Sequence, residues 1–264
     1  MTESTYEYLT AQTQDGIATV TLANPAKRNP LSLATMGELL TAFETIRKDS
    51  AVKVVVLRGL GPAFSAGHDL RELQCAGDEA DVVRLRAIFD ACVRVMTAIQ
   101  SVPQPVIAEV AGIATAAGCQ LVASCDLAIA SSEAQFATPG VNIGLFCTTP
   151  MVALTRAIGR KHAMEMLLTG DFIDAATAER WGLVNRVVPA AELAGATLAL
   201  ARKIAASSAF VVGLGKEAFY AQIDLDQPKA YAYAKEVMSM NALAADAQEG
   251  IGAFLERRAP TWKQ

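Results

Sequence analysis

Three short runs of aliphatic residues constrain the fold of this chain more than any other feature. They are residues 51–57 (AVKVVVL), 106–110 (VIAEV) and 127–130 (LAIA). Branched aliphatic residues favour strands, and continuous apolar runs of this length are typical of strands buried on both faces. Apolar residues recur with helical spacing before and between the first two runs, over residues 33–48 and about 81–101. Strands that alternate with helices in this way predict an α/β fold.

The segments on either side of these runs complete the prediction. Residues 6–12 and 17–22 alternate in polarity around an Asp15-Gly16 pair, which predicts a hairpin. A small-residue turn at 111–118 leads into a short helix before the third run. Beyond it the chain is mostly helical, over residues 149–168, 175–181, 189–206, 209–222 and 228–256. We therefore expect a strand-and-helix core over 1–190 and a helical C-terminal region over 191–264.

The composition limits the classes of function. Apolar residues make up 52% of the 264 residues and charged residues 19%, which is enough for a large buried core. The net charge of −4 argues against a general nucleic-acid binder, so an anionic ligand must be held by local features. Apolar stretches are interrupted before they reach the ~18 residues of a membrane span, and we expect no membrane partner.

Cysteines and histidines indicate the compartment and the absence of a metal centre. The five cysteines are odd in number and include no CxxC pair, which favours a reducing compartment. The first ten residues, MTESTYEYLT, contain no signal-peptide pattern, so the sequence predicts a cytoplasmic location. The two histidines, His68 and His162, lie far apart in the chain, and a histidine-rich metal site is not expected.

Three motifs, in a fixed order along the chain, carry a resemblance to a known family. They are residues 24–32 (NPAKRNPLS), 63–73 (AFSAGHDLREL) and 105–127 (PVIAEVAGIATAAGCQLVASCDL). Weaker matches are 134–136 (AQF), Pro139, Gly144, 175–188 and 254–258 (FLERR). Together they resemble the enoyl-CoA hydratase/isomerase (crotonase) superfamily, and in wording the subgroup of enoyl-CoA hydratase domain-containing proteins.

The resemblance implies a spiral of repeated ββα units whose C-terminal helices build a homotrimer or a dimer of trimers. It implies an acyl-CoA substrate and no separate cofactor, since coenzyme A is part of the substrate. It also implies that two backbone N–H groups bind the thioester carbonyl and stabilise the enolate that develops there. The residue before Asp69 supplies the first donor, which is His68, and the middle of the small triplet 116–118 supplies the second, which is Ala117.

Elementary chemistry agrees with these two positions. Gly67 allows a ligand to approach the backbone beside His68. Ala117 is expected where a helix begins, so its N–H is unpaired within the helix and the dipole favours negative charge. Preorganised donors of this kind are worth roughly 3–4 kcal/mol each. The alternative is that the small residues 116–118 only allow close helix packing.

The other expected site residues flank these donors. The His68 ring has the ordinary pKa of a general acid–base, but we expect its backbone to matter and its ring to be a pocket wall or to face away. Asp69 is expected to cap the next helix. The resemblance places Lys27, Arg28, Ala66, His68, Asp69 and Leu70 at the coenzyme A site. Arg257, Arg258 and Lys263 are further candidates for phosphate contacts, from the same subunit or across a subunit boundary.

Two departures put the usual hydratase chemistry in doubt. The resemblance maps the two glutamates of true hydratases to Gln120 and Gly140. Addition of water needs one group that activates water and one that delivers a proton. Gln120, which the resemblance makes a catalytic-site residue, can orient water or a carbonyl but cannot exchange protons usefully. Gly140 offers no side chain.

Several functions remain open. An enzyme without the two carboxylates could decarboxylate a malonyl-type thioester or hydrolyse a thioester. Hydratase or isomerase activity could persist through a water network or His68, or the chain could bind acyl-CoA without catalysis. Residues that could replace the carboxylates are Asn142, Cys147, Thr148, Thr149 and Cys119, although a free cysteine is more often a buried apolar residue. Glu109 is expected to be paired within the core.

Overall fold

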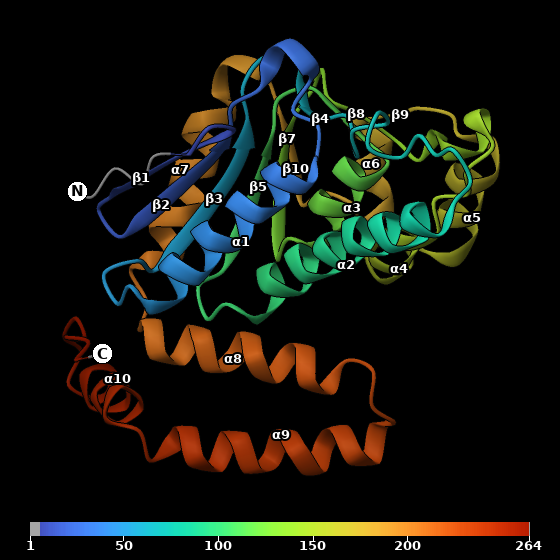
Figure 1. Ribbon diagram of the computed structural model, residues 1–264. Coiled ribbons are helices and arrows are strands. Elements are labelled where there is room, and N and C mark those ends of the chain that lie inside the picture. The colour runs from blue at the N-terminus through green and yellow to red at the C-terminus, as the bar shows by residue number, and fades with distance from the viewer. Residues whose placement is uncertain (1–5, 264) are drawn as a thin grey trace.

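A computed structural model describes residues 6–263 and contains two sheets with ten α-helices in that part of the chain (Figure 1). The larger sheet has six strands, in the spatial order β1 (Leu9–Gln14), β2 (Ile17–Leu22), β3 (Val54–Gly59), β5 (Val106–Val110), β7 (Leu127–Ser131) and β10 (Arg186–Val188). β1 and β2 form the antiparallel hairpin predicted around Asp15-Gly16, and the other neighbours are parallel. The α/β prediction is confirmed.

The smaller sheet was not predicted. Its four strands, in spatial order, are β4 (Ala63–Ser65), β6 (Ile113–Thr115), β8 (Gln135–Ala137) and β9 (Ile173–Asp174). β4, β6 and β8 are parallel, and β9 is antiparallel to β8. Strands of two or three residues are too short to show a period of two, so sequence patterning could not detect them.

Helices cover the larger sheet on both faces (Figure 1). The helices before residue 190 are α1 (Leu33–Lys48), α2 (Glu79–Ser101), α3 (Ala117–Ser124), α4 (Thr148–Ala157), α5 (Arg160–Thr169) and α6 (Ala175–Trp181). Short 3₁₀ turns are η1 (Pro25–Lys27), η2 (Pro139–Ile143) and η3 (Ala190–Glu192). The predicted helix 149–168 is two helices, because the chain turns at Gly159, which is the N-cap of α5.

Four further helices follow, α7 (Leu193–Ala205), α8 (Ala209–Gln222), α9 (Gln227–Ala242) and α10 (Ala245–Leu255). The predicted helix 228–256 is likewise two, divided at residues 243–244. α7 packs its Ala201 against Val54, Val56 and Ile107 on one face of the larger sheet. α8, α9 and α10 lie below the sheet in Figure 1. The division into 1–190 and 191–264 stays a prediction.

A buried ion pair attaches α8 to the core. The Lys216 ammonium contacts the Asp126 carboxylate at 2.6 Å and donates to the carbonyls of Ile99 (2.7 Å) and Gln104 (2.9 Å). The Tyr220 hydroxyl donates to the other oxygen of Asp126 at 2.9 Å. Burial lowers the pKa of Lys216, and all three of its donors are satisfied. One side chain thus joins α8 to the ends of α2, β5 and β7.

Candidate functional site

The two segments predicted to carry the donors lie against each other at one end of the smaller sheet. β4 and β6 are parallel neighbours, so the chain leaves both at the same edge. It leaves β4 through Gly67, which has a φ of +89°. A Cβ atom on Gly67 would lie 3.1 Å from the Ala117 nitrogen and 3.0 Å from the Thr115 carbonyl oxygen. A side chain at residue 67 would therefore separate the segments of His68 and Ala117.

Gly118 makes the second close contact between these segments. A Cβ atom there would lie only 2.2 Å from the carbonyl oxygen of Ser65 at the end of β4. The first turn of α3 thus rests directly on the backbone of β4. Glycine is required at both 67 and 118 because protein backbone approaches protein backbone at each residue; the approach of a ligand beside Gly67 stays a prediction.

Both predicted donor groups are unused by the fold. The first hydrogen bond of α3 is donated by Gln120 to the carbonyl of Ala116 at 3.0 Å, so the Ala117 N–H precedes the hydrogen-bonded turns. It lies at the positive end of the helix dipole. Beside it, Gly67 donates to the Ser65 hydroxyl at 3.2 Å. Within residues 6–263, neither the His68 N–H nor the Ala117 N–H donates to a protein acceptor.

Ala116, which precedes α3, has a strained backbone. Its φ of 49° and ψ of −119° match the first central position of a type II′ turn, where glycine is normal. The conformation is held from both sides, because its N–H donates to Ala137 (2.9 Å) and its carbonyl accepts from Gln120. A residue other than glycine in such a conformation costs about 1–3 kcal/mol. The fold tolerates this cost directly beside the Ala117 N–H.

The loop that precedes α1 brings Lys27 and Arg28 to the same edge. The Arg28 carbonyl accepts from the Ala66 N–H at 2.9 Å, and the Leu31 N–H donates to Gly67 at 2.8 Å. The side chains of Lys27 and Arg28 are exposed, as is Ala66. The structure therefore places two cations next to the first donor segment, although these residues lie about 40 positions apart in the chain.

Two positioning residues were missed by the sequence analysis, Asn29 and Ser65. The buried Asn29 amide donates to the Ala63 carbonyl (2.8 Å), and its oxygen accepts from the Asn24 N–H (2.9 Å). The Ser65 hydroxyl donates to the Asn29 carbonyl at 2.8 Å. These bonds hold the Lys27 loop on β4. The available signal was an asparagine in a turn, because asparagine tolerates the left-handed φ of 51° that Asn29 adopts.

The His68 ring packs against α2. Its Nδ1 lies 3.2 Å from the Leu31 carbonyl oxygen, and its edge meets Phe89 with the ring centroids 5.5 Å apart. Because a carbonyl only accepts, Nδ1 carries the proton and Nε2 is a lone pair. Nε2 is buried and has no hydrogen-bond partner among the described residues. Burial lowers the pKa of the ring, so the imidazole is neutral at pH 7.

Asp69 does not cap the next helix, which corrects the prediction for this residue. Its carboxylate accepts from the Arg71 N–H at 3.0 Å within a single turn. α2 begins ten residues later, at Glu79, and its N-cap is Asp78. The prediction fails because Asp69 precedes the turn 70–73, which does not continue into a helix. Asp69 is half-buried and Leu70 is 54% exposed.

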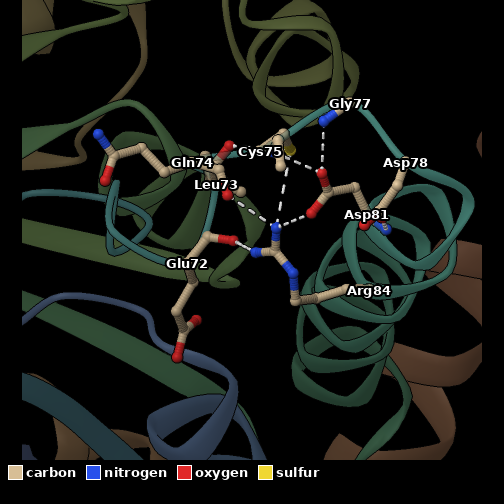
Figure 2. A network of polar contacts seen from close by, with 9 residues as sticks. Glu72, Leu73, Gln74, Cys75, Gly77, Asp78, Asp81 and Arg84 are labelled. Carbon is tan, nitrogen blue, oxygen red and sulfur yellow. Dashed lines mark hydrogen bonds and ion pairs between the residues drawn. The ribbon is translucent and has the colours of Figure 1, made fainter.

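Arg84 of α2 fastens the segment between His68 and α2 (Figure 2). Its guanidinium donates to the carbonyls of Glu72 and Gln74, the latter at 2.7 Å, and pairs with Asp81. The other Asp81 oxygen accepts from the Gly77 N–H at 2.8 Å. The Arg84 guanidinium, together with the backbone N–H groups that donate to the Asp81 carboxylate, lowers the pKa of Asp81 to about 2. The Glu72 carboxylate in turn accepts from the first N–H of α1 at 2.9 Å.

Gln120 is buried between α3 and α2. Its side chain is 4% exposed, and its carbonyl oxygen accepts from the Cys92 thiol at 3.7 Å. Burial raises the pKa of Cys92 to about 12, so the thiol stays protonated and remains a donor. Neither partner exchanges protons at neutral pH, as expected for Gln120 from the sequence.

Gly140 lies where the backbone folds back on itself. A Cβ atom at this residue would lie 2.6 Å from the Leu145 carbonyl oxygen and 2.8 Å from the Cys147 sulfur. The Leu145 N–H donates to the Gly140 carbonyl at 2.9 Å, which closes the turn. The position therefore lacks a carboxylate and also lacks the space for one.

The other candidate replacements for the carboxylates lack suitable chemistry or a defined role. Burial raises the pKa of Cys119 to about 12 and raises that of Cys147, so neither is a ready thiolate. Glu109 is paired, as predicted, but its partner Arg58, at 3.7 Å, is 42% exposed, so the pair lies at the edge of the core and not within it. Asn142 is exposed, and Thr148 and Thr149 begin α4. No group of three or more metal-ligating side chains occurs within residues 6–263.

The similarity of the whole chain to known proteins decides the family. The model of the enoyl-CoA hydratase/isomerase family matches residues 12–264. The chain belongs to this family. A human relative, named enoyl-CoA hydratase domain-containing protein 3, mitochondrial, is 49% identical over 252 residues, which cover 96% of this chain and 82% of the relative.

Solved structures agree with this membership. The crystal structure of human enoyl Coenzyme A hydratase domain-containing protein 3 has a TM-score of 0.94 at 48% identity and covers 97% of this chain and 100% of that one. An enoyl-CoA hydratase from Mycobacterium smegmatis has a TM-score of 0.93 at 47% identity, with 97% and 99% covered. The predicted crotonase-like fold and the subgroup of domain-containing proteins are confirmed.

The predicted cytoplasmic location is wrong by this comparison. The human relative and those from mouse and zebrafish carry the word mitochondrial in their names. The prediction rested on reduced cysteines and on the polar first residues. Reduced cysteines do not distinguish the cytoplasm from other reducing compartments, so composition could not decide this point.

The C-terminal cations that were expected to reach the site lie far from it within one chain. Figure 1 shows α10 at the opposite end of the molecule from β4. Arg258, which follows α10, pairs with Glu249 at 2.6 Å and with Glu256 at 2.7 Å. A contact from Arg257, Arg258 or Lys263 to a ligand of another subunit stays a prediction, and so does the trimer itself.

Within residues 6–263, no single helix has the length and apolar character of a membrane span. One pair of helices, Ala190–Ala205 and Ala209–Gln222, has them together but is bent by 102°.

Proposed function

We propose that this chain binds a coenzyme A thioester and holds its carbonyl oxygen with the N–H groups of His68 and Ala117. The observation that carries the proposal is the contact at Gly67, where a Cβ would lie 3.1 Å from the Ala117 nitrogen. Two unused N–H groups on adjoining segments, one of them at a helix start, suit a developing oxyanion. Family membership supports an acyl-CoA ligand.

The anionic part of coenzyme A binds along the loop of Lys27 and Arg28. Both side chains are exposed, and the Arg28 carbonyl is hydrogen-bonded to Ala66 beside the donors. The net charge of the chain is −4, so these local cations supply the attraction for phosphate. The thioester then enters the site past Ala66, with Asp69 and Leu70 at its border.

The reaction that suits this site is decarboxylation of a malonyl-type thioester. The C–C bond to the carboxylate breaks, CO₂ leaves, and the electron pair forms an enolate whose oxygen is held by the two N–H groups. Water then protonates C2 of the enolate. The step needs no acid or base at 120 or 140, which suits a buried amide at Gln120 and the closed turn at Gly140. Hydration would need proton transfer at both positions.

The binding claim is tested with a ligand pair, without mutation. Butyryl-CoA and its thioether analogue S-butyl-CoA differ in the carbonyl, so calorimetry measures what the N–H groups contribute. Two hydrogen bonds at about 1 kcal/mol each predict about 30-fold weaker binding of the thioether. Equal affinities would contradict a carbonyl site, and no binding of either ligand would contradict the coenzyme A site.

The reaction claim is tested with three classes of thioester. Malonyl-type CoA esters, crotonyl-CoA and saturated acyl-CoA are incubated with the protein, and products are followed by mass spectrometry. We expect CO₂ loss from the first class and little hydration of the second. Hydration of crotonyl-CoA, or release of free coenzyme A from the third, would replace decarboxylation with that activity. Binding without any conversion would leave the binding proposal standing and refute catalysis.

A further inference from the structure

The side-chain amide of Gln120 is held at one end by a buried thiol. Its carbonyl oxygen accepts from Cys92 at 3.7 Å, and burial raises the pKa of that thiol to about 12, so the thiol stays a donor. Within residues 6–263 the amide nitrogen donates to no acceptor, yet it is not one of the enclosed polar atoms that lack a partner, such as Nε2 of His68. The nitrogen therefore borders space that water can reach.

The surrounding helices place that space beside the two backbone donors. Helical side chains lean toward the N-terminal end, so in α3 the Gln120 side chain leans back over the turn that begins at Ala117. On α2, Phe89 meets the His68 ring. Cys92, three residues later on the same face of α2, meets Gln120. Three residues advance a helix by about 4.5 Å, so the His68 ring and the Gln120 amide lie along α2 about one turn apart.

The orientation of the amide decides what residue 120 recognises. An amide offers an acceptor oxygen at one end and a donor nitrogen at the other. Because the Cys92 thiol binds the oxygen, the nitrogen is left for a ligand. An N–H donor binds an anionic acceptor most strongly, through a charge-assisted hydrogen bond. A glutamate at residue 120 would instead present an acceptor and repel an anion.

We propose that the Gln120 amide nitrogen donates to the carboxylate on C2 of a malonyl-type thioester, and that Cys92 is the positioning residue that fixes the amide in this orientation. The proposal rests on the proposed function and names the substrate group that residue 120 recognises. A malonyl-type thioester carries its carboxylate on the carbon next to the carbonyl, so the two groups lie within about one helical turn, or 5.4 Å, of each other. A carbonyl held by Ala117 therefore brings the carboxylate to the turn of Gln120.

The test compares two coenzyme A esters that share a shape and differ in charge at C2. Sulfoacetyl-CoA carries a sulfonate, which cannot leave as CO₂, and 3,3-dimethylbutyryl-CoA carries an uncharged tert-butyl group. Calorimetry on the wild-type protein should show a preference for the sulfonate ester. Gln120→Met keeps the length of the side chain but removes the donor, and it should reduce this preference at least about 10-fold, as expected for one hydrogen bond to a charged group.

Variants of Cys92 separate positioning from packing. Cys92→Ala removes the S–H donor and should lower the preference by about 2- to 10-fold, whereas Cys92→Ser restores a donor and should keep the wild-type preference. A packing defect would weaken both esters alike and leave their ratio unchanged. The matched control is Cys125→Ala, which removes another buried thiol, one that donates to the Leu121 carbonyl of α3 at 3.2 Å. The control should keep the wild-type ratio.

Each outcome bears on a different claim. A preference that Gln120→Met leaves unchanged overturns the donor role of Gln120. A preference that Cys92→Ala lowers no more than Cys125→Ala, or that Cys92→Ser fails to keep, overturns the positioning role. If Cys92→Ala does not fold, Cys92→Val fills the space without a donor and takes its place.

A third ligand separates failure of this proposal from failure of the proposed function. A wild-type protein that binds butyryl-CoA but does not prefer the sulfonate ester overturns the proposal, while the proposed function stands. A wild-type protein that binds none of the three esters refutes the proposed function itself.

Discussion

Restoring the two glutamates of hydratases, with Gln120→Glu and Gly140→Glu, tests whether this chain is a hydratase that has lost only its side chains. The structure predicts that the restoration fails at residue 140. A Cβ there would lie 2.6 Å from the Leu145 carbonyl oxygen and 2.8 Å from the Cys147 sulfur. Ordinary contacts begin at 3.4 Å, so the backbone carbonyl would have to move by about 0.8 Å.

The cost follows from what holds that carbonyl. Overpacking of this kind costs about 1–3 kcal/mol, and movement of Leu145 strains its 2.9 Å hydrogen bond to Gly140, worth about 1 kcal/mol more. Gly140→Ala already introduces the Cβ, so it should lose roughly 2–4 kcal/mol of unfolding free energy and lower the melting temperature by roughly 5–15 °C. Gly140→Glu should lose at least as much.

Thermal unfolding of Gly140→Ala, Gly140→Glu and the double variant measures this loss, and crotonyl-CoA hydration measures the function. Gly37→Ala is the control, because α1 leaves nothing within 4 Å of a Cβ there, and it should gain about 0.5–1 kcal/mol. We expect Gln120→Glu to give no hydratase activity and the double variant to be unstable as well as inactive.

A double variant that hydrates crotonyl-CoA and unfolds at the wild-type temperature would refute this expectation. That result would mean that the turn 140–145 opens at little cost and that the chain is a hydratase lacking only its two carboxylates. A stable double variant without activity would contradict the packing argument alone.

Three further predictions concern the surroundings of the site. Lys216→Met leaves the buried Asp126 carboxylate without its positive partner and should lower the unfolding free energy, measured in urea, by about 3–5 kcal/mol. The loss should be smaller when Asp126→Asn is combined with it, and a loss under about 1 kcal/mol would contradict a buried ion pair. The fold lowers the pKa of His68, so the unfolded chain binds a proton at this ring more readily than the folded chain. The contribution of the neutral ring to stability is therefore complete above pH 6.5 and is lost as the pH falls below 6.5. The unfolding free energy of a His68→Gln variant should decline less steeply between pH 6.5 and 5 than that of the wild type, and equal slopes would count against a buried neutral ring. Arg84→Met should speed amide hydrogen exchange in residues 72–77 at least about 10-fold, while Arg86→Met on the same helix should not; equal protection in both would show that the network of Figure 2 does not hold the segment.

The larger sheet could be predicted because its strands carry their own signal. Residues 106–110 were predicted with the bounds observed, because four of the five residues are apolar and the run follows Pro103 and Pro105. The smaller sheet has strands of two or three residues, which show no periodicity. Yet that sheet brings residues 66–68 and 115–118 together. The architecture near the site was thus the part least visible in the sequence.

The positions of the two proposed donors were predicted from the family resemblance, but the residues that hold the first of their backbone segments in place were not. Asn29 and Ser65 act through hydrogen bonds to backbone atoms more than 30 residues away, which no local pattern reveals. The same holds for the space at Gly140. Its sequence showed that a carboxylate was missing, but only the fold shows that a side chain does not fit. Long-range backbone contacts account for both omissions.

The two proposed donors belong to the main chain, and this has a consequence for how the protein can be studied. Ala117 is already alanine, and His68→Ala would keep its N–H, so an alanine scan would pass over both groups without loss. The positions that such a scan would reveal are Asn29, Ser65 and Arg84, which shape the backbone from outside the site. An alanine scan of this chain would therefore detect the residues that hold the backbone in place, whereas the two proposed donor groups would need a test that changes the ligand.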